Sequence, residues 1–268
     1  MRGTKTISVT SGKGGVGKST IIANLALQLS EMDQKVLILD GDIGMANMDI
    51  MFGSRAPFNI IDVLNEKKSL DEIIHPINPR IDLISGGSGI TDFYKMSTFQ
   101  KRSLLDIIEQ IQYKYDYLLV DTAPGLNEHV FYLNAAVDQA ILVLTPEPAS
   151  FTDAYALLKV MYNNFHLKRI TILCNQVRDY QEGIHLFHKF ADVVDQFLNV
   201  GLNLIGVIPH DQNMRKLNFQ QRLVVNQNPD SCVAEAFRGI SFNLLDDSLI
   251  PNTSQGLKLF WSQLVGLA

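Results

Sequence analysis

The sequence predicts an α/β domain in which helices cover both faces of a doubly wound, mostly parallel sheet. Short runs of β-branched and other apolar residues recur along the chain, and such near-continuous runs suit strands that are buried on both faces. The runs are Thr6–Thr10, Lys35–Leu39, Ile81–Ile84, Tyr117–Val120, Ala140–Leu144, Ile170–Cys174 and Leu204–Ile208. Helical patterns separate most of them, at Ser19–Met32, Thr98–Tyr113, Thr152–Phe165 and Glu182–Phe197. This alternation of strand and helix is typical of a parallel sheet.

The composition is that of an ordinary globular protein. Of 268 residues, 46% are hydrophobic and 19% are charged, which allows a sizeable core. The net charge of −5 counts against direct DNA binding by the surface as a whole. Cys174 and Cys232 lie far apart without a CxxC pair, so the sequence gives no support for a zinc or iron–sulfur site. Without a signal core or a spanning apolar stretch, we expect a cytoplasmic protein.

The clearest motif is the glycine-rich stretch that follows the first predicted strand. It satisfies GxxxxGK[ST] and opens the first helix, which is the context of a phosphate-binding loop. Glycines let backbone N–H groups approach phosphate oxygens, and the helix N-terminus adds positive potential. Lys18 would reach the β- and γ-phosphates, and Ser19 would offer its hydroxyl to Mg²⁺. The predicted nucleotide-binding residues here are Gly12, Lys13, Gly14, Gly15, Val16, Gly17, Lys18, Ser19 and Thr20.

Acidic residues follow two of the predicted strands. Asp40 and Asp42 end the second run, and Asp121 ends the apolar run before Thr122. Carboxylates at the carboxyl ends of parallel strands lie beside the phosphate-binding loop, where they suit Mg²⁺ and water. We therefore predict a metal site at Ser19, Asp42 and Asp121, with Asp40 holding metal-bound waters or a loop lysine. The alternative interpretation of Asp40 and Asp42 is a pair of solvated turn acids.

Lys13, directly after the first loop glycine, resembles the signature lysine of the MinD/ParA family of deviant Walker A ATPases. The resemblance implies that Lys13 reaches across an ATP-bound homodimer to the partner's phosphates, as an arginine finger does. It also implies that Asp42 orients the attacking water. Lys13, Lys18 and Asp42 are thus the expected catalytic residues, with ATP or ADP and Mg²⁺ as cofactors.

The same resemblance suggests where the base binds. In the family, an asparagine at a strand end reads the adenine edge, which points to Asn175, with Arg178 nearby. Pro209 and Asp211 match family positions around the adenine and ribose. The sequence lacks an NKxD guanine motif, which favours ATP over GTP. The alternative is a simple strand-end asparagine and a proline-led turn.

Further stretches resemble the FlhG/FleN branch, whose members limit flagellar number. They are Ser150–Lys159, Gln181–Gly183, Met214–Lys216 and the pair Gln221 and Arg222, whereas Asp42–Asp49 fits this branch and cell-division MinD alike. The branch implies partners such as an FlhF-type GTPase, a flagellar switch protein or a flagellar transcription activator.

The C-terminus, residues 253–268, predicts an amphipathic helix after an ATPase domain at residues 1–252. Within Gly256–Leu267, the apolar positions 257, 260, 261, 264 and 267 have helical spacing. Relatives end in a helix that lies on the membrane when ATP drives dimerisation, which would place the protein peripherally on the inner face of the cytoplasmic membrane. Here Lys258 is the basic residue of the polar face, whereas interfacial helices usually carry several. A terminal helix docked on the domain is the alternative.

The leading hypothesis is an ATP-hydrolysing, dimerising switch that regulates flagellar number and placement. Two alternatives stay open: MinD-like selection of the division site, and a nucleotide-gated module that sequesters a transcription activator with little turnover. Plasmid partitioning, as in ParA, is disfavoured by the acidic composition. Reductase-like relatives need suitably placed cysteines, and the sequence does not offer them.

Overall fold

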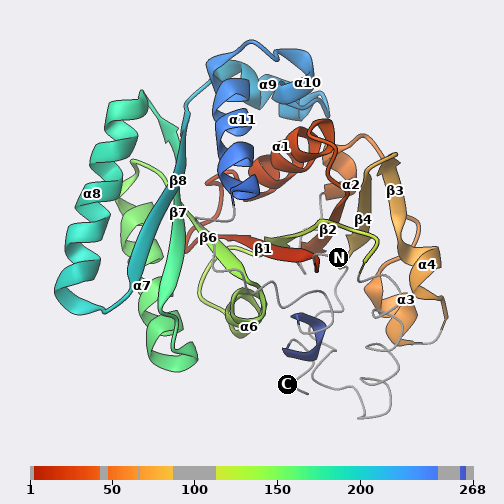
Figure 1. The fold of residues 1–268 in the computed structure, drawn as a ribbon, viewed down its shortest axis with the longest axis horizontal. Helices are drawn as coiled ribbons and strands as arrows, with labels where there is room; N and C mark the ends of the chain where they lie inside the picture. Colours follow the sequence, from red (N-terminus) through yellow and green to blue (C-terminus); the bar gives the residue numbers. More distant parts are fainter. Residues whose placement is uncertain (1–2, 43–47, 66, 87–112, 247–259, 264–268) are drawn as a thin grey trace.

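An eight-stranded sheet forms the centre of the molecule, in the order β3-β4-β2-β5-β1-β6-β7-β8 (Figure 1). The structure is a computed structural model, and it describes residues 3–42, 48–65, 67–86, 113–246 and 260–263. The strands are β1 Lys5–Thr10, β2 Val36–Gly41, β3 His75–Asn78, β4 Ile81–Ser85, β5 Tyr117–Thr122, β6 Gln139–Leu144, β7 Arg169–Val177 and β8 Gly201–Pro209. All neighbouring strands are parallel except β3 and β4. The predicted fold class is confirmed.

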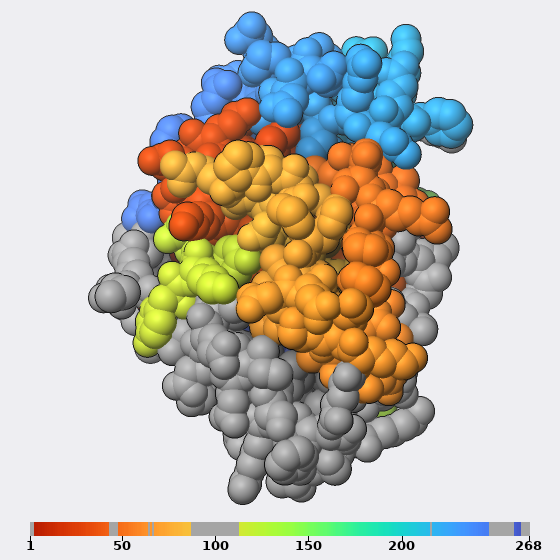
Figure 2. Space-filling model, turned by 90° about the vertical axis from the view of Figure 1, so that its right-hand side faces the viewer, coloured from red at the N-terminus to blue at the C-terminus, as the bar shows by residue number. Residues whose placement is uncertain are grey.

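Helices cover both faces of this sheet. On one face, α1, α2, α10 and α11 pack in a hydrophobic cluster with β1, β2 and β4. On the other, α3, α4, α6, α7 and α8 contribute to two further clusters. The helices are α1 Lys18–Glu31, α2 Met48–Met51, α3 Ile60–Leu64, α4 Leu70–Ile73, α6 Glu128–Ala136, α7 Pro148–Phe165, α8 Tyr180–Phe197, α9 Gln212–Phe219, α10 Val224–Gln227 and α11 Cys232–Leu245. Seen from the β3 edge, residues 48–86 form a layer beside α1 and below α9–α11 (Figure 2).

The predicted strands and helices are found close to their expected bounds. Six of the seven apolar runs lie wholly within a strand, and the run Lys35–Leu39 begins one residue before β2. Each of these strands extends one to three residues beyond its run at one or both ends. The sequence analysis missed β3, a short edge strand with Pro76 inside it, because it has no apolar run and pairs antiparallel across a bulge. Of the predicted helix at residues 98–113, all but Tyr113 lies outside the described residues.

Apolar and polar side chains alternate along β1, and the two kinds contact helices on opposite faces of the sheet. Ile7 and Val9 are fully buried in the cluster that includes α1 and α11. On the opposite face, the Ser8 hydroxyl donates to Asn134 Oδ1 at 2.7 Å, and Asn134 Nδ2 donates to the Thr10 hydroxyl at 3.0 Å. These buried bonds connect α6 to the strand that leads into the glycine-rich loop, and so fix where the loop begins.

The C-terminal residues that the structure describes are docked on the domain. Residues 260–263 are helical, and Phe260 and Trp261 are 0% and 1% exposed. Their rings belong to the hydrophobic cluster that includes Leu133 and Ala136 of α6. For these two side chains the docked alternative holds, and the rest of the predicted C-terminal helix lies outside the described residues. Within the described part of the chain, no helix is both long and apolar enough to span a membrane.

We expect Trp261→Ala to destabilise the whole domain although it lies near the chain end. Removing a fully buried indole leaves a cavity and should lower the free energy of unfolding by about 3–5 kcal/mol. Urea unfolding followed by circular dichroism measures this change. Phe219→Ala is the control, because that ring is 93% exposed and should change stability by no more than about 0.5 kcal/mol. Equal, small effects would show that the C-terminal segment is not part of the core.

Candidate nucleotide-binding site

The glycine-rich loop between β1 and α1 passes very close to the backbone of α7 and to a side chain at the end of β7. A Cβ on Gly12 would lie 2.2 Å from the backbone carbon and oxygen of Asp153 in α7. Gly17, with φ 97°, is the N-cap residue of α1, and a Cβ there would lie 2.7 Å from Asn175 Nδ2. No other residue type fits at these two positions without displacing the neighbours. The loop is therefore held between the start of α7 and the end of β7.

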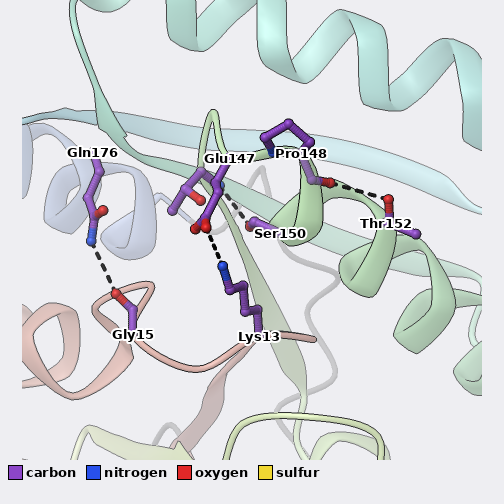
Figure 3. A network of polar contacts seen from close by, with 8 residues as sticks. Lys13, Gly15, Glu147, Pro148, Ser150, Thr152 and Gln176 are labelled. Atoms are coloured by element: carbon purple, nitrogen blue, oxygen red, sulfur yellow. Dashed lines mark hydrogen bonds and ion pairs between the residues drawn. The ribbon is translucent and has the colours of Figure 1, made fainter.

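A β-bulge at the end of β7 supplies the polar contacts on one side of the loop. The register with β8 shifts between Asn175 and Val177, and Gln176 has φ 58°. As a result, Asn175 Nδ2 donates to the Val16 carbonyl at 2.7 Å. Gln176 Nε2 donates to the Gly15 carbonyl at 3.3 Å (Figure 3). Bulges next to functional sites commonly re-aim side chains in this way. The two bonds hold loop carbonyls toward β7, so these oxygens do not compete for the phosphate side.

Asn175 therefore supports the loop, and its role as a base-reading residue stays a prediction. The sequence analysis did not select Gln176. Its signal was a second amide side chain at the end of an apolar strand, directly after Asn175.

Lys18 is buried at the start of α1, with 7% of its surface exposed. Burial lowers the pKa of its ammonium group, and the negative charges of Asp121 and Asp42 partly oppose that shift. The two carboxylates are thus the counterions of Lys18 within the protein. A bound polyphosphate would supply further negative charge at the same place.

Asp121, at 2% exposure, is the most strongly perturbed acid of the site. Desolvation raises its pKa to about 7, helped by repulsion from Asp40 and Asp42 and opposed by a hydrogen bond with Ser19 and by the charge of Lys18. Its Oδ1 is buried and has no hydrogen-bond partner among the described residues. An unpartnered carboxylate oxygen beside a serine hydroxyl fits the ligand set through which P-loop proteins hold Mg²⁺.

In P-loop sites, phosphate oxygens and waters fill most positions around Mg²⁺. Among the described residues, no group of three or more His, Cys, Asp or Glu side chains could hold a metal ion.

Asp40 has a task that the sequence analysis did not assign to it. Its carboxylate accepts from the backbone N–H of Asp42 at 3.2 Å and from that of Met48 at 3.1 Å. These bonds connect the two ends of the segment between β2 and α2. Asp42, the acid predicted to orient water, is half-buried and close enough to influence the pKa values of Lys18 and Asp121.

Lys13 lies apart from these acids. Its ammonium group forms an ion pair with Glu147, the residue that precedes α7 (Figure 3). The two side chains are 31% and 58% exposed, so the pair is at the surface. The loop therefore carries one buried lysine directed at the acids and one exposed lysine bound to the α7 start.

The predicted base-binding residues gather at the ends of β7 and β8. Val177 pairs with Pro209 across these strands, and Arg178 and Pro209 line one hollow of about 600 Å³. Arg178, with an 80% exposed side chain, forms an ion pair with Asp179 at 3.0 Å. Asp211 caps α9 by accepting from the backbone N–H of Asn213 at 2.6 Å. The structure thus brings Asn175, Arg178 and Pro209 to one end of the sheet.

Comparison with protein families matches residues 3–245 to the ParA model, described as NUBPL iron-transfer P-loop NTPase. The chain belongs to the ParA family of P-loop NTPases. The family consists of ATPases that use ATP and Mg²⁺, so the predicted enzyme class and cofactors are confirmed. Cys174 lies buried in β7 and Cys232 exposed at the start of α11.

Two similar relatives belong to flagellar systems by name. The chain is 34% identical over 265 residues to the antiactivator FleN of Pseudomonas aeruginosa, covering 99% of this chain and 95% of the relative. It is 31% identical to the flagellum site-determining protein YlxH of Helicobacter pylori, covering 98% and 90%. These matches confirm the FlhG/FleN branch that the sequence resembles.

Septum site-determining MinD proteins are also similar. The solved MinD of Pyrococcus horikoshii complexed with Mg-ADP superposes with a TM-score of 0.69 at 28% identity, covering 90% of this chain and 96% of that one. The MinC:MinD complex of Aquifex aeolicus reaches a TM-score of 0.71 at 23% identity with the same coverage, which supports the fold.

We expect the stability of the nucleotide-free protein to depend on pH through the ionisation of the buried Asp121 carboxyl group. A carboxyl group of ordinary pKa, about 3.9, ionises readily in the unfolded chain, whereas here its folded pKa is about 7. Ionisation therefore costs stability increasingly as the pH rises from about 4 to 7. Asp121→Asn should gain melting temperature relative to the unchanged protein across that window and keep the gain above it. A melting-temperature difference that does not depend on pH would contradict the raised pKa.

Proposed function

We propose that this protein is an ATP-driven switch that regulates the number and placement of flagella. The observation that carries the proposal is the similarity to FleN and YlxH over nearly the whole chain, at 34% and 31% identity. The MinD proteins of Synechocystis and Thermotoga maritima are 28% and 27% identical over 89% and 88% of the chain.

In the proposed site, the backbone of residues 12–17 surrounds the phosphates and Lys18 neutralises their charge. Ser19 and Asp121 would hold Mg²⁺, which neutralises charge on the phosphate oxygens when it is bound. The attacking water would be oriented by Asp42, whose backbone position is fixed by its bond to Asp40. Asn175, Arg178, Pro209 and Asp211 would surround the adenine and ribose.

Lys13 would link ATP binding to dimerisation. In the monomer it is paired with Glu147, and exposed ion pairs of this kind are weak. The polyphosphate of a second subunit offers several negative charges, so Lys13 would exchange Glu147 for the partner's phosphates when two ATP-bound copies meet. Glu147 then acts as a resting partner that keeps the exposed lysine oriented before assembly.

The ATP-bound dimer would act on flagellar partners from the cytoplasmic side. Candidates are an FlhF-type GTPase, a flagellar switch protein or a flagellar transcription activator, the last in keeping with the name antiactivator for FleN. Any contact of the C-terminal helix with the membrane would require release of Phe260 and Trp261, because both rings are buried in the described structure.

Deleting the gene and counting flagella per cell by electron microscopy tests the proposed function. Extra or misplaced flagella with normal septa are expected. Normal flagella with minicells would instead identify a MinD-like regulator of division, which the similarity to septum site-determining proteins keeps as the second candidate.

Size measurements with purified protein test the switch itself. We expect Asp42→Ala to be a dimer in ATP and a monomer in ADP, since it binds ATP but does not hydrolyse it. Adding Lys13→Ala should abolish the dimer, whereas adding Glu147→Gln should lower the ATP concentration for half-dimerisation by about two- to fivefold. A monomer in both nucleotides would contradict the cycle. If the unchanged protein hydrolyses ATP no faster than the Asp42→Ala variant, a module that sequesters a partner with little turnover would be favoured instead.

A further inference from the structure

Helix α9 is joined to the first turn of α1 by a hydrogen bond between two side chains. In Figure 1, α9 and α10 lie beside α1, and Met214 and Leu217 of α9 pack against the hydrophobic cluster that contains the buried side of α1. Asn218 lies on the same face of α9, and its Nδ2 donates to the Thr20 hydroxyl at 3.0 Å. Thr20 is one of the predicted nucleotide-binding residues, whereas the sequence analysis did not select Asn218. The bond therefore connects α9 directly to the predicted site.

A second polar contact holds α10 to the same part of α1. The N–H of Val225 donates to Asn24 Oδ1 at 3.3 Å, and Asn24 Nδ2 donates to the Thr20 carbonyl at 2.9 Å. Asn24 is fully buried, so water cannot replace these partners. The segment from α9 to α10 is thus fixed beside Thr20 at two places, which gives the Asn218 amide a defined position.

The bond from Asn218 determines where the proton of the Thr20 hydroxyl can point. A threonine in a helix often donates its hydroxyl to the carbonyl four residues earlier, which here is that of Val16. That carbonyl already accepts from Asn175 Nδ2 at 2.7 Å. An amide N–H only donates, so the Thr20 oxygen accepts from Asn218 and its proton points elsewhere. No residue in the described part of the chain accepts a hydrogen bond from this hydroxyl, and Thr20 is half-buried, so a ligand can reach it.

The position of Thr20 indicates which phosphate its hydroxyl faces. Lys18 and Ser19, directly before it, are predicted to serve the β- and γ-phosphates and Mg²⁺. Asp211, predicted to lie by the adenine and ribose, caps the start of α9, and the last turn of that helix is bonded to Thr20. Thr20 thus connects the phosphate loop to the helix that begins at the ribose side. The α-phosphate is the group that joins the ribose to the β-phosphate.

We propose that Asn218 is a positioning residue for nucleotide binding, because its bond to Thr20 directs the threonine hydroxyl at an α-phosphate oxygen. A phosphate oxygen accepts hydrogen bonds, so it needs the donor side of that hydroxyl. Without the Asn218 amide, the hydroxyl can turn toward other acceptors or water, and its contact with the phosphate becomes weaker. This role rests on the nucleotide site of the proposed function.

The contact should affect the affinity for nucleotide and leave the chemical step unchanged. Hydrolysis breaks the bond between the β- and γ-phosphates, so the α-phosphate contact is the same in the ground state and the transition state. Such an interaction changes KM and not kcat. Asn218→Ala should therefore raise the KM for ATP about three- to tenfold, the size of one hydrogen bond, with kcat unchanged. A lower kcat at saturating ATP would overturn the role, because Asn218 would then act on the reacting γ-phosphate.

A double-mutant cycle in ADP affinity tests whether Asn218 acts through Thr20. Calorimetry with the full-length protein compares Asn218→Ala, Thr20→Val and the two changes together. Asn218→Ala should weaken ADP binding about three- to tenfold, and the double variant should bind ADP no more weakly than Thr20→Val alone. Thr20→Ser keeps the hydroxyl, so it should retain most of the affinity and remain sensitive to Asn218→Ala. Losses that multiply independently would overturn the role.

Asn243→Ala is the matched control, because it removes a similar bond between a different pair of elements. Asn243 Nδ2 donates to the Ile205 carbonyl at 2.9 Å and connects α11 to β8, in partly buried surroundings like those of Asn218. This variant should leave ADP affinity unchanged, and a loss equal to that of Asn218→Ala would instead indicate general loosening of the domain. If the unchanged protein does not bind ADP, the proposed nucleotide site fails as well. If it binds and Asn218→Ala has no effect, only the role of Asn218 is wrong.

A second test asks whether the α-phosphate is the group that the Thr20 hydroxyl contacts. The probe is ADP with sulfur in place of one α-phosphate oxygen, because sulfur is a weak hydrogen-bond acceptor. The unchanged protein should bind one of the two diastereomers more weakly than ADP, and Asn218→Ala should lose that preference. A purely structural effect on α9 would not remove it. Full retention of the preference in the variant, or no preference in the unchanged protein, would contradict the proposal.

Discussion

The close approach of the glycine-rich loop to its two neighbours is the constraint on which the site depends. Gly12 leaves no room for a Cβ against the α7 backbone, and Gly17 leaves none against Asn175. Because the loop lies against the α7 backbone and the Asn175 side chain, it cannot shift toward either without displacing one of them. The polar bonds from Asn175 and Gln176 then fix the direction of the loop carbonyls. Position and orientation of the phosphate-binding backbone are therefore set by packing before any ligand arrives.

The charges of the site are arranged around this fixed loop and are poorly solvated. Lys18 and Asp121 are both nearly inaccessible, and burial is the largest cause of each pKa shift. An isolated buried lysine or carboxylate would be costly, so each reduces the cost of the other. The site therefore contains polar groups without a full set of partners, and among the described residues the buried Asp121 Oδ1 is the clearest of them. Phosphate and Mg²⁺ can pair with these groups. The free energy of binding therefore comes from side chains that are already in position.

The sequence contained enough to predict the sheet, the loop and the acids at the strand ends. Buried parallel strands leave long apolar runs, and the loop motif stands between a strand and a helix, so both signals are local. Contacts that arise only when separate segments meet could not be predicted: the Glu147 partner of Lys13, the bond from Gln176 to Gly15, and the bond from the Met48 N–H to Asp40. The β3 strand was missed because a sheet edge needs no apolar run. The predicted membrane-facing residues Phe260 and Trp261 have an apolar pattern that serves a docked segment equally well, and periodicity alone does not distinguish the two.

The burial of Trp261 has a spectroscopic consequence. It is the one tryptophan of the chain, and its ring lies in a cluster built from β2, β5 and α6. Asp40 and Asp121 are the residues before the last in β2 and β5, so the indole packs against the strands that carry the acids of the nucleotide site. Its emission spectrum comes from a single, water-shielded environment. The molecule thus contains a native optical probe, in which a red shift would signal departure of the C-terminal segment without any added label.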